Sequence, residues 1–210
     1  MSNAFAFFDR VYYINLDMRS DRRREIESEI RKWSISAERF PGILLGEFPD
    51  KTLRRLGNKL CHYVLVQKAK SLGLKNVLIL EDDAVFVEDI DAKLNAAIED
   101  TKKVPWDIFY IGYESFGYGH GTLQPVTDNI AKTQAMYLTH AYAINCTAYD
   151  KILNTLANSK LADAVDYAIV HDSAPYQIYC TTTKLAFQRP SISDIENAVP
   201  TWAQMPPQTS

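Results

Sequence analysis

Cysteine is scarce in this chain, with three residues in 210, at positions 61, 146 and 180. An odd number of widely separated thiols fits neither a disulfide framework nor a thiolate zinc site. We therefore interpret Cys61, Cys146 and Cys180 as small core residues of a reduced protein, and we expect a cytoplasmic location.

Excess positive charge and long apolar runs are also lacking. The formal net charge is −3, which excludes nucleic acid as the main partner because phosphate backbones are bound by basic surfaces. No apolar run approaches the roughly 20 residues that span a bilayer, so we expect no transmembrane segment. Peripheral contact with the inner face of the membrane stays open. Residues 1–4 show no charged-then-apolar leader and are interpreted as a remnant of expression tagging.

Two common phosphate-binding motifs are missing as well. Residues 117–121 read Gly-Tyr-Gly-His-Gly, which lacks the spacing of a dinucleotide-binding loop, and no Walker loop is present. Arg22, Arg23 and Arg24 form a short basic run. We interpret it as the solvated face of a helix, with phosphate binding as the less favoured alternative.

What the sequence does contain is an alternation of strand and helix patterns. Apolar runs predict strands at residues 11–15, 77–80, 107–112, 140–145 and 178–187. Helical spacing of apolar residues predicts helices that include 26–33 and 53–64, the second ended by Gly73, and further helices near 91–101, 147–158 and 162–171. We expect an α/β fold with a mixed, mostly parallel central sheet flanked by helices, in one domain over residues 5–195.

Two segments differ in composition from the rest. Four of the eight glycines fall in residues 112–122 together with several aromatic residues, which predicts a mobile aromatic loop. Residues 196–210 are rich in proline and end in polar residues, which predicts a flexible tail.

Three adjacent carboxylates, Glu81, Asp82 and Asp83, stand between the apolar runs 77–80 and 84–87. Apolar neighbours on both sides predict partial desolvation, which costs several kcal/mol unless a pKa shift or a cation relieves it. Ligands bind at the ends of parallel strands in α/β folds, and a hard divalent ion is the natural partner there. The alternative, that one carboxylate caps a helix while the others are solvated, stays equally open on this evidence.

At this point the sequence resembles a known family. Residues 11–23 are similar to the opening Ile-Asn-Leu … Asp-Arg-Arg of glycosyltransferase family 25, and residues 57–62 to its Gly-Cys-x-Leu-Ser-His helix, at the right distance before the acidic triplet. Later blocks of the family are similar to residues 106–112, 139–144, 166–167 and 191–195. Asn58 and Cys61 depart from the family pattern, and neither change removes a carboxylate.

The resemblance implies a GT-A-type fold and a nucleotide-sugar donor, usually a UDP-sugar. It further implies inverting transfer of a hexose, galactose or glucose, to a saccharide or glycolipid acceptor, as in lipopolysaccharide or lipooligosaccharide synthesis. Two alternatives remain: a metal-dependent phosphoester hydrolase, and a catalytically silent nucleotide-binding module.

The family analogy also assigns roles at the donor site. Asp83 is the expected direct ligand of Mn²⁺ or Mg²⁺, and Glu81 and Asp82 face the ribose and the metal's waters, with Asn15 as a further donor-binding residue. His140 is a candidate metal ligand that favours Mn²⁺, with a core role equally open. For His62 we favour a core or supporting role.

The acceptor side is assigned in the same way. Asp166 matches the family position we expect to act as general base, although an Asp at such a place also commonly caps its own helix. Asp172 is its neighbour along the chain. Asp194 is expected to be structural or close to the phosphates. Loop residues Tyr113, Glu114 and Tyr118 are the candidate acceptor contacts.

Overall fold

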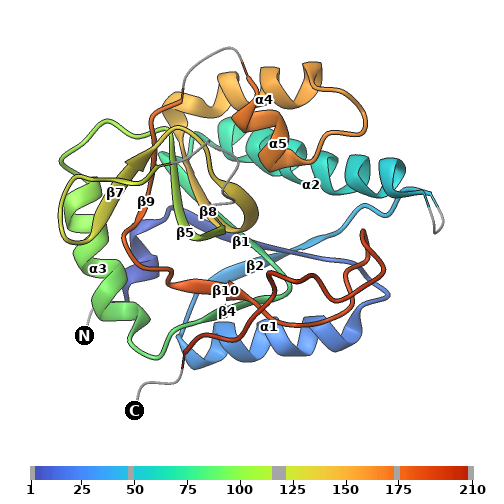
Figure 1. Cartoon of the computed structure of the whole chain (residues 1–210), viewed down its shortest axis with the longest axis horizontal. Helices are drawn as coiled ribbons and strands as arrows, with labels where there is room; N and C mark the ends of the chain where they lie inside the picture. The colour runs from blue at the N-terminus through green and yellow to red at the C-terminus, as the bar shows by residue number, and fades with distance from the viewer. Residues whose placement is uncertain (1–2, 47–49, 115–121, 173–175, 208–210) are drawn as a thin grey trace.

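The structure is a computed structural model that describes residues 3–46, 50–114, 122–172 and 176–207. Its centre is a ten-stranded sheet with helices on both faces (Figure 1). In chain order the elements are η1 (Ala4–Phe7), β1 (Arg10–Asn15), α1 (Ser20–Lys32), β2 (Ala37–Pro41), α2 (Lys51–Ser71), β3 (Asn76–Glu81), β4 (Ala84–Phe86), α3 (Ile90–Thr101), β5 (Ile108–Glu114), β6 (Gln124–Pro125), β7 (Ile130–Thr133), β8 (Tyr137–Asn145), η2 (Cys146–Ala148), α4 (Tyr149–Asn158), α5 (Val165–Val170), β9 (Ile178–Thr181) and β10 (Ala186–Gln188).

The sheet is mixed, and most of its strands share one direction. Its order is β2-β1-β3-β8-β5-β9-β7-β6, and β10 pairs with both β5 and β4. The pairings make β1, β2, β3, β5, β6, β9 and β10 run one way and β4, β7 and β8 the other. This is the α/β fold with a mixed, mostly parallel sheet that the sequence predicted.

Alternating side chains of the central strands build a separate core on each face of the sheet. In β3, Val77 and Ile79 join the core under α2 and α4, whereas Leu78 and Leu80 join the core under α1 and α3. Successive side chains of a strand point to opposite faces, so a continuous apolar run is what two buried faces demand. The apolar run at 77–80 therefore correctly predicts a strand in the middle of the sheet, covered on both faces.

The predicted helices correspond to α1, α2, α3, α4 and α5, and Gly73 ends α2 with a φ of +64°. The predicted strand 178–187 is wrong in its extent: it is two strands, β9 and β10, joined by a turn. Residues 186–188 leave the line of β9 and pair with β4 instead. Of the expected mobile loop, Gly112 and Tyr113 belong to β5, and residues 115–121 lie outside the described part of the chain.

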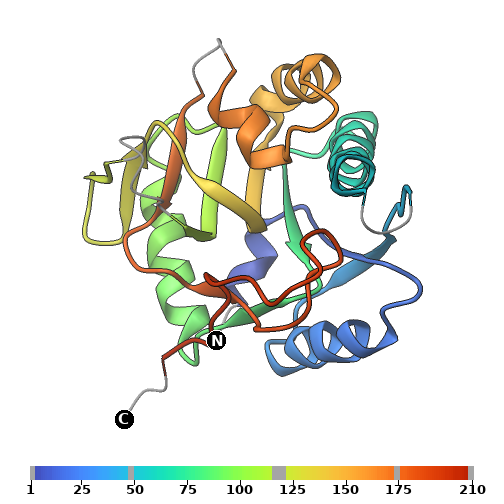
Figure 2. The same ribbon diagram turned by 45° about the vertical axis from the view of Figure 1, so that its right-hand side comes forward.

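Both ends of the described chain contact the domain. The Asn3 side chain caps η1 and donates to the carbonyl of Ser34 at 2.6 Å, and Ala4 is buried. At the other end, Nε1 of Trp202 donates to Oε1 of Gln188 at 2.9 Å. Figure 2 shows this C-terminal segment passing between α1 and α2. Tagging and tail flexibility stay predictions.

Two of the three cysteines are core residues, as expected, and the third is not. Cys61 and Cys180 are buried, and Cys146 is exposed. Cys146 follows the last residue of β8, where the chain leaves the sheet and begins η2. At this position none of the described helices covers the side chain, and it is exposed to solvent. Within the described residues, no helix combines the length and the apolar character needed to cross a membrane.

Candidate active site

A cavity of about 320 Å³ opens where β1 and β3 end. Its wall combines the ends of these strands, the first turns of α2, the start of β8, the start of α5 and the C-terminal segment. Among the lining residues are Asn15, Glu81, Asp82, Asp83 and Asp166. The fold therefore brings five of the six predicted site residues to one cavity, across distances of up to 151 positions in the chain.

Glu81 is the last residue of β3, and its carboxylate is held by two neighbours. Oγ1 of Thr139, on the adjacent strand β8, donates to Oε1 of Glu81 at 2.8 Å. Nε2 of His62 lies 3.6 Å from the same oxygen. His62 is fully buried, and its Nδ1 is 2.8 Å from the hydroxyl of Tyr142. His62 thus has the supporting role favoured from the sequence.

Asp82 accepts hydrogen bonds on both carboxylate oxygens. Nδ2 of Asn15 donates to Oδ2 at 2.8 Å, and Nη1 of Arg22 donates to Oδ1 at 3.0 Å. Burial raises the pKa of Asp82 despite the attraction of Arg22. Asn15 and Asp82 are therefore joined directly, which links the end of β1 to the turn after β3.

Asp83 is the least satisfied carboxylate of the triplet. Its Oδ2 lies 3.4 Å from Nη1 of Arg22, while its Oδ1 is buried and has no hydrogen-bond partner. Burial, together with the neighbouring charges of Glu81 and Asp82, raises the pKa of Asp83 to about 7. An acceptor that is buried and unpaired costs free energy, so this oxygen is suited to a cation.

The interpretation of the arginine run as a solvated face is wrong for Arg22. Its side chain is buried among the carboxylates, whereas Arg23 and Arg24 are exposed. Position 22 lies one helical turn before Ile26, whose exposed fraction is 0%, and residues four apart share a helix face. That four-residue spacing indicated in the sequence that Arg22 faces the core. The interpretation of the three arginines as one solvated run overlooked it.

The residues present fit a hard divalent cation only in part. Among the described residues, no group of three or more His, Cys, Asp or Glu side chains is arranged to hold a metal ion. The unpaired oxygen of Asp83 is nevertheless an oxygen ligand of the kind that Mg²⁺ and Mn²⁺ accept. Magnesium commonly uses one or two carboxylates with substrate phosphates and water completing its shell. The site fits an ion that arrives with a phosphate-bearing ligand.

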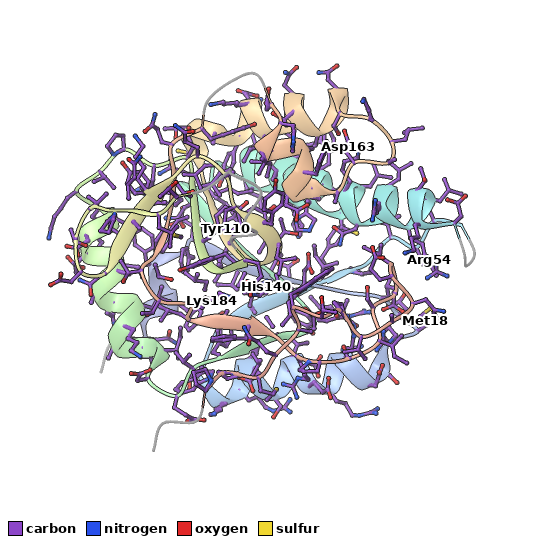
Figure 3. The ribbon with its side chains drawn as sticks, viewed as in Figure 1. Met18, Arg54, Tyr110, His140, Asp163 and Lys184 are labelled. Atoms are coloured by element: carbon purple, nitrogen blue, oxygen red, sulfur yellow. The ribbon has the colours of Figure 1, made fainter. Side chains whose placement is uncertain are left out.

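His140 is buried behind the cavity and is not among the residues that line it. Its Nε2 lies 3.2 Å from the carbonyl oxygen of Ala186, and burial lowers its pKa. A Cβ added at Gly112 would come within 2.2 Å of this ring, so the ring packs directly on β5. Figure 3 shows His140 in the interior of the molecule. A metal-binding role for His140 stays a prediction.

Asp166, in the first turn of α5, lines the cavity on the side of β8. Its Oδ2 accepts from the main-chain N–H of Leu138 at 2.9 Å, and its Oδ1 from that of Tyr167 at 2.7 Å. Burial raises its pKa. Leu138 has a φ of +68°, a conformation that non-glycine residues rarely adopt and that is frequent near functional sites. The Asp166 carboxylate therefore stabilises the strained main chain at Leu138 and also lines the cavity.

The remaining candidate residues that the structure describes, Asp172, Tyr113 and Glu114, do not line the cavity. Asp172 lies outside the cavity lining and bonds to Thr155 and to the hydroxyl of Tyr176. The expectation for Tyr113 is wrong, because the side chain is buried and its hydroxyl donates to the carbonyl of Thr181 at 2.7 Å. Glu114 forms an ion pair with Lys184, and Tyr118 lies outside the described residues.

The C-terminal segment contributes lining residues of which the sequence had indicated only Asp194. Gln188, Asp194, Glu196, Pro200 and Trp202 all border the cavity. Its main anchors are ion pairs of Asp194 with Arg19 and of Glu196 with Lys51 and Arg55. Arg54, which Figure 3 labels at the start of α2, donates to the carbonyl of Asp194 at 2.7 Å. The structural role expected for Asp194 agrees with these contacts.

The comparisons with known proteins bear on this site. No family model matches the chain. Procollagen galactosyltransferase 2 of Mus musculus is 25% identical over 204 residues, covering 82% of this chain and 32% of that protein. The inactive glycosyltransferase 25 family member 3 of Homo sapiens is 26% identical over 197 residues, covering 82% and 33%. The chain thus spans about a third of the length of the curated relatives it matches.

Among solved structures, A197 from STIV has a TM-score of 0.49 at 11% identity and covers 96% of this chain and 98% of its own. The two sequence relatives each align with 82% of this chain. The comparisons confirm that this chain resembles glycosyltransferase family 25.

Proposed function

We propose that the chain is a hexosyltransferase that moves galactose or glucose from a UDP-sugar to a hydroxyl of a saccharide or glycolipid acceptor, with inversion, as in lipopolysaccharide or lipooligosaccharide synthesis. The observation that carries the proposal is one cavity lined by Asn15, by the triplet Glu81, Asp82 and Asp83, and by Asp166. The resemblance to glycosyltransferase family 25 supports the reaction class. The name of the mouse relative supports galactose as the first sugar to test.

Asp83 would hold the divalent ion, Mn²⁺ or Mg²⁺, through its unpaired Oδ1. When bound, such an ion stabilises the negative charge that develops on the diphosphate leaving group. Asp82 is fixed in place by Asn15 on one oxygen and Arg22 on the other. Asn15 and Asp82 thereby form a rigid rim on which the donor's polar groups can bind.

Asp166 would take the proton from the acceptor hydroxyl. Burial raises its pKa above the ordinary value of 3.8, and a higher pKa makes a carboxylate a stronger base. Its bonds from two main-chain N–H groups fix the direction of the carboxylate. Asp166 comes from α5 and Asp83 from the turn after β3, and inversion requires that Asp166 act on the face of the sugar opposite the diphosphate.

A catalytically silent nucleotide-binding module is the second candidate, because a human relative that matches 82% of this chain is named inactive. Both candidates bind a nucleotide, and they differ in whether a sugar is transferred. The test is a panel of nucleotide-sugars with saccharide acceptors, with and without Mn²⁺, read by nucleotide release and by acceptor labelling.

Acceptor labelling that requires Mn²⁺ and one UDP-sugar supports the transferase. Nucleotide binding without labelling of any acceptor supports the silent module. Release of free sugar or phosphate in the absence of acceptor would instead favour hydrolysis.

A further inference from the structure

The Arg22 guanidinium lies beside the carboxylates of Asp82 and Asp83, whose negative charges it partly balances. Its Nη1 lies 3.0 Å from Oδ1 of Asp82 and 3.4 Å from Oδ2 of Asp83. The residue lines the cavity and is only 7% exposed. One guanidinium therefore neutralises part of the charge of both carboxylates, which are themselves buried.

The other side of the guanidinium is anchored to the C-terminal segment. Nη2 of Arg22 donates to Oγ of Ser191 at 2.6 Å and to the carbonyl of Ile192 at 3.0 Å. The remaining nitrogen, Nε, is buried and has no hydrogen-bond partner. Arg22 thus has fixed contacts on two nitrogens and a spare donor on the third.

A spare, buried N–H on a fixed cation is a feature that an anionic ligand can satisfy. Arginine binds phosphate oxygens with several parallel N–H donors and keeps its charge at all physiological pH values. A phosphate oxygen that enters the cavity would be attracted to Arg22 and would complete its hydrogen bonding. The aspartates alone offer no such partner for an anion.

The position of Arg22 lowers the affinity of the site for a divalent ion when no diphosphate is bound. A metal on Asp83 would sit within a few ångströms of Arg22, and two cations repel strongly where solvent screening is weak. The repulsion falls when a diphosphate supplies negative charge that both cations share. Arg22 and a metal ion on Asp83 would then both be attracted to the same anion.

We infer that Arg22 is the chain's own counter-cation for the acidic site, opposing divalent-ion binding until a nucleoside diphosphate enters the cavity and accepts from its guanidinium. This inference rests on the proposed function for the presence of metal and diphosphate. It adds that the ion and the nucleotide bind as a coupled pair and that Arg22 sets the coupling.

The experiment measures Mn²⁺ affinity by electron paramagnetic resonance in the full chain, first without nucleotide and then with UDP. In Arg22→Gln we expect Mn²⁺ alone to bind at least about tenfold tighter than in the wild type, because a repelling unit charge has gone. We expect UDP with saturating Mn²⁺ to bind more weakly, because the phosphate loses its donor. Loss of fold alone cannot tighten metal binding.

The matched control is Arg23→Gln. It removes the same charge from the next position of α1, where Arg23 is exposed and pairs with Glu27. Mn²⁺ affinity should equal that of the wild type in this variant. Equal tightening in both variants would overturn the inference, because it would reflect net charge and not contact with the carboxylates.

Circular dichroism establishes that each variant is folded. If Arg22→Gln does not fold, Arg22→Met carries the test, because it also removes the charge while keeping an unbranched side chain that can pack in the same place, and Mn²⁺ alone should again bind tighter than in the wild type. Unchanged or weaker Mn²⁺ binding in the folded variant overturns the inference even when the wild type binds Mn²⁺ with UDP. Absence of Mn²⁺ binding from every protein, with or without UDP, overturns the metal site of the proposed function and the inference together.

Discussion

Replacing Asp83 with asparagine should stabilise the metal-free protein at neutral and higher pH. The pKa of Asp83 is about 7 in the folded chain against an ordinary value of 3.8. Each pKa unit corresponds to about 1.4 kcal/mol, so keeping this buried carboxylate ionised costs folding up to about 4 kcal/mol above pH 7. The amide of the substituted side chain carries no charge and avoids that cost at every pH.

The pH dependence follows from the direction of the shift. A raised carboxyl pKa means that the folded state binds the proton more tightly than the unfolded state. The contribution of Asp83 is therefore most favourable below about pH 4 and is lost as the pH rises through 7. We expect Asp83→Asn and the wild type to have similar unfolding free energies near pH 4 and to diverge by pH 8.

The assay is urea unfolding at several pH values in the presence of a metal chelator. Asp150→Asn is the control, because its side chain is 80% exposed and pairs with Lys70 at the surface. Its stability difference from the wild type should stay small at every pH. A folded Asp83→Asn that gains nothing between pH 5 and pH 8, or that is less stable at pH 8, would refute the reasoning.

Two further predictions concern catalysis and packing. Asp166→Asn should reduce transfer by about 10²- to 10⁴-fold and leave UDP affinity nearly unchanged in calorimetry, because a general base acts in the transition state; a larger loss in the control Asp172→Asn would move the base to that residue. Gly57→Ala should lower the melting temperature although alanine is the better helix former, because its Cβ would lie 2.3 Å from the carbonyl oxygen of Ile43; an unchanged or higher melting temperature would contradict that contact.

The central part of the fold could be predicted from the sequence because its pattern is local. The run at 77–80 is apolar at every position, and only a strand covered on both faces needs that. The partners of β9 and β10 could not be predicted in this way. The polar residues 181–184 interrupt the apolar segment, but the change of partner from β7 to β4 is a tertiary event.

The part of the site that lies at the ends of strands could be predicted from the sequence. Asn15 ends β1 and Glu81 ends β3, and parallel strands side by side bring such positions together. Arg22 was misread because charge was weighed before helical spacing. Apart from Asp194, the C-terminal lining was not predictable, because the bond from Trp202 to Gln188 joins two uncharged side chains in segments without a pattern.

The measurement that tests the account most directly is calorimetric titration of UDP into the wild type and Asp83→Asn, each with and without Mn²⁺. The account predicts that Mn²⁺ strengthens UDP binding to the wild type and that this Mn²⁺-dependent part disappears in a folded Asp83→Asn. Undiminished Mn²⁺-dependent binding of UDP to the variant would contradict the assignment of Asp83 as the metal ligand at the donor's diphosphate.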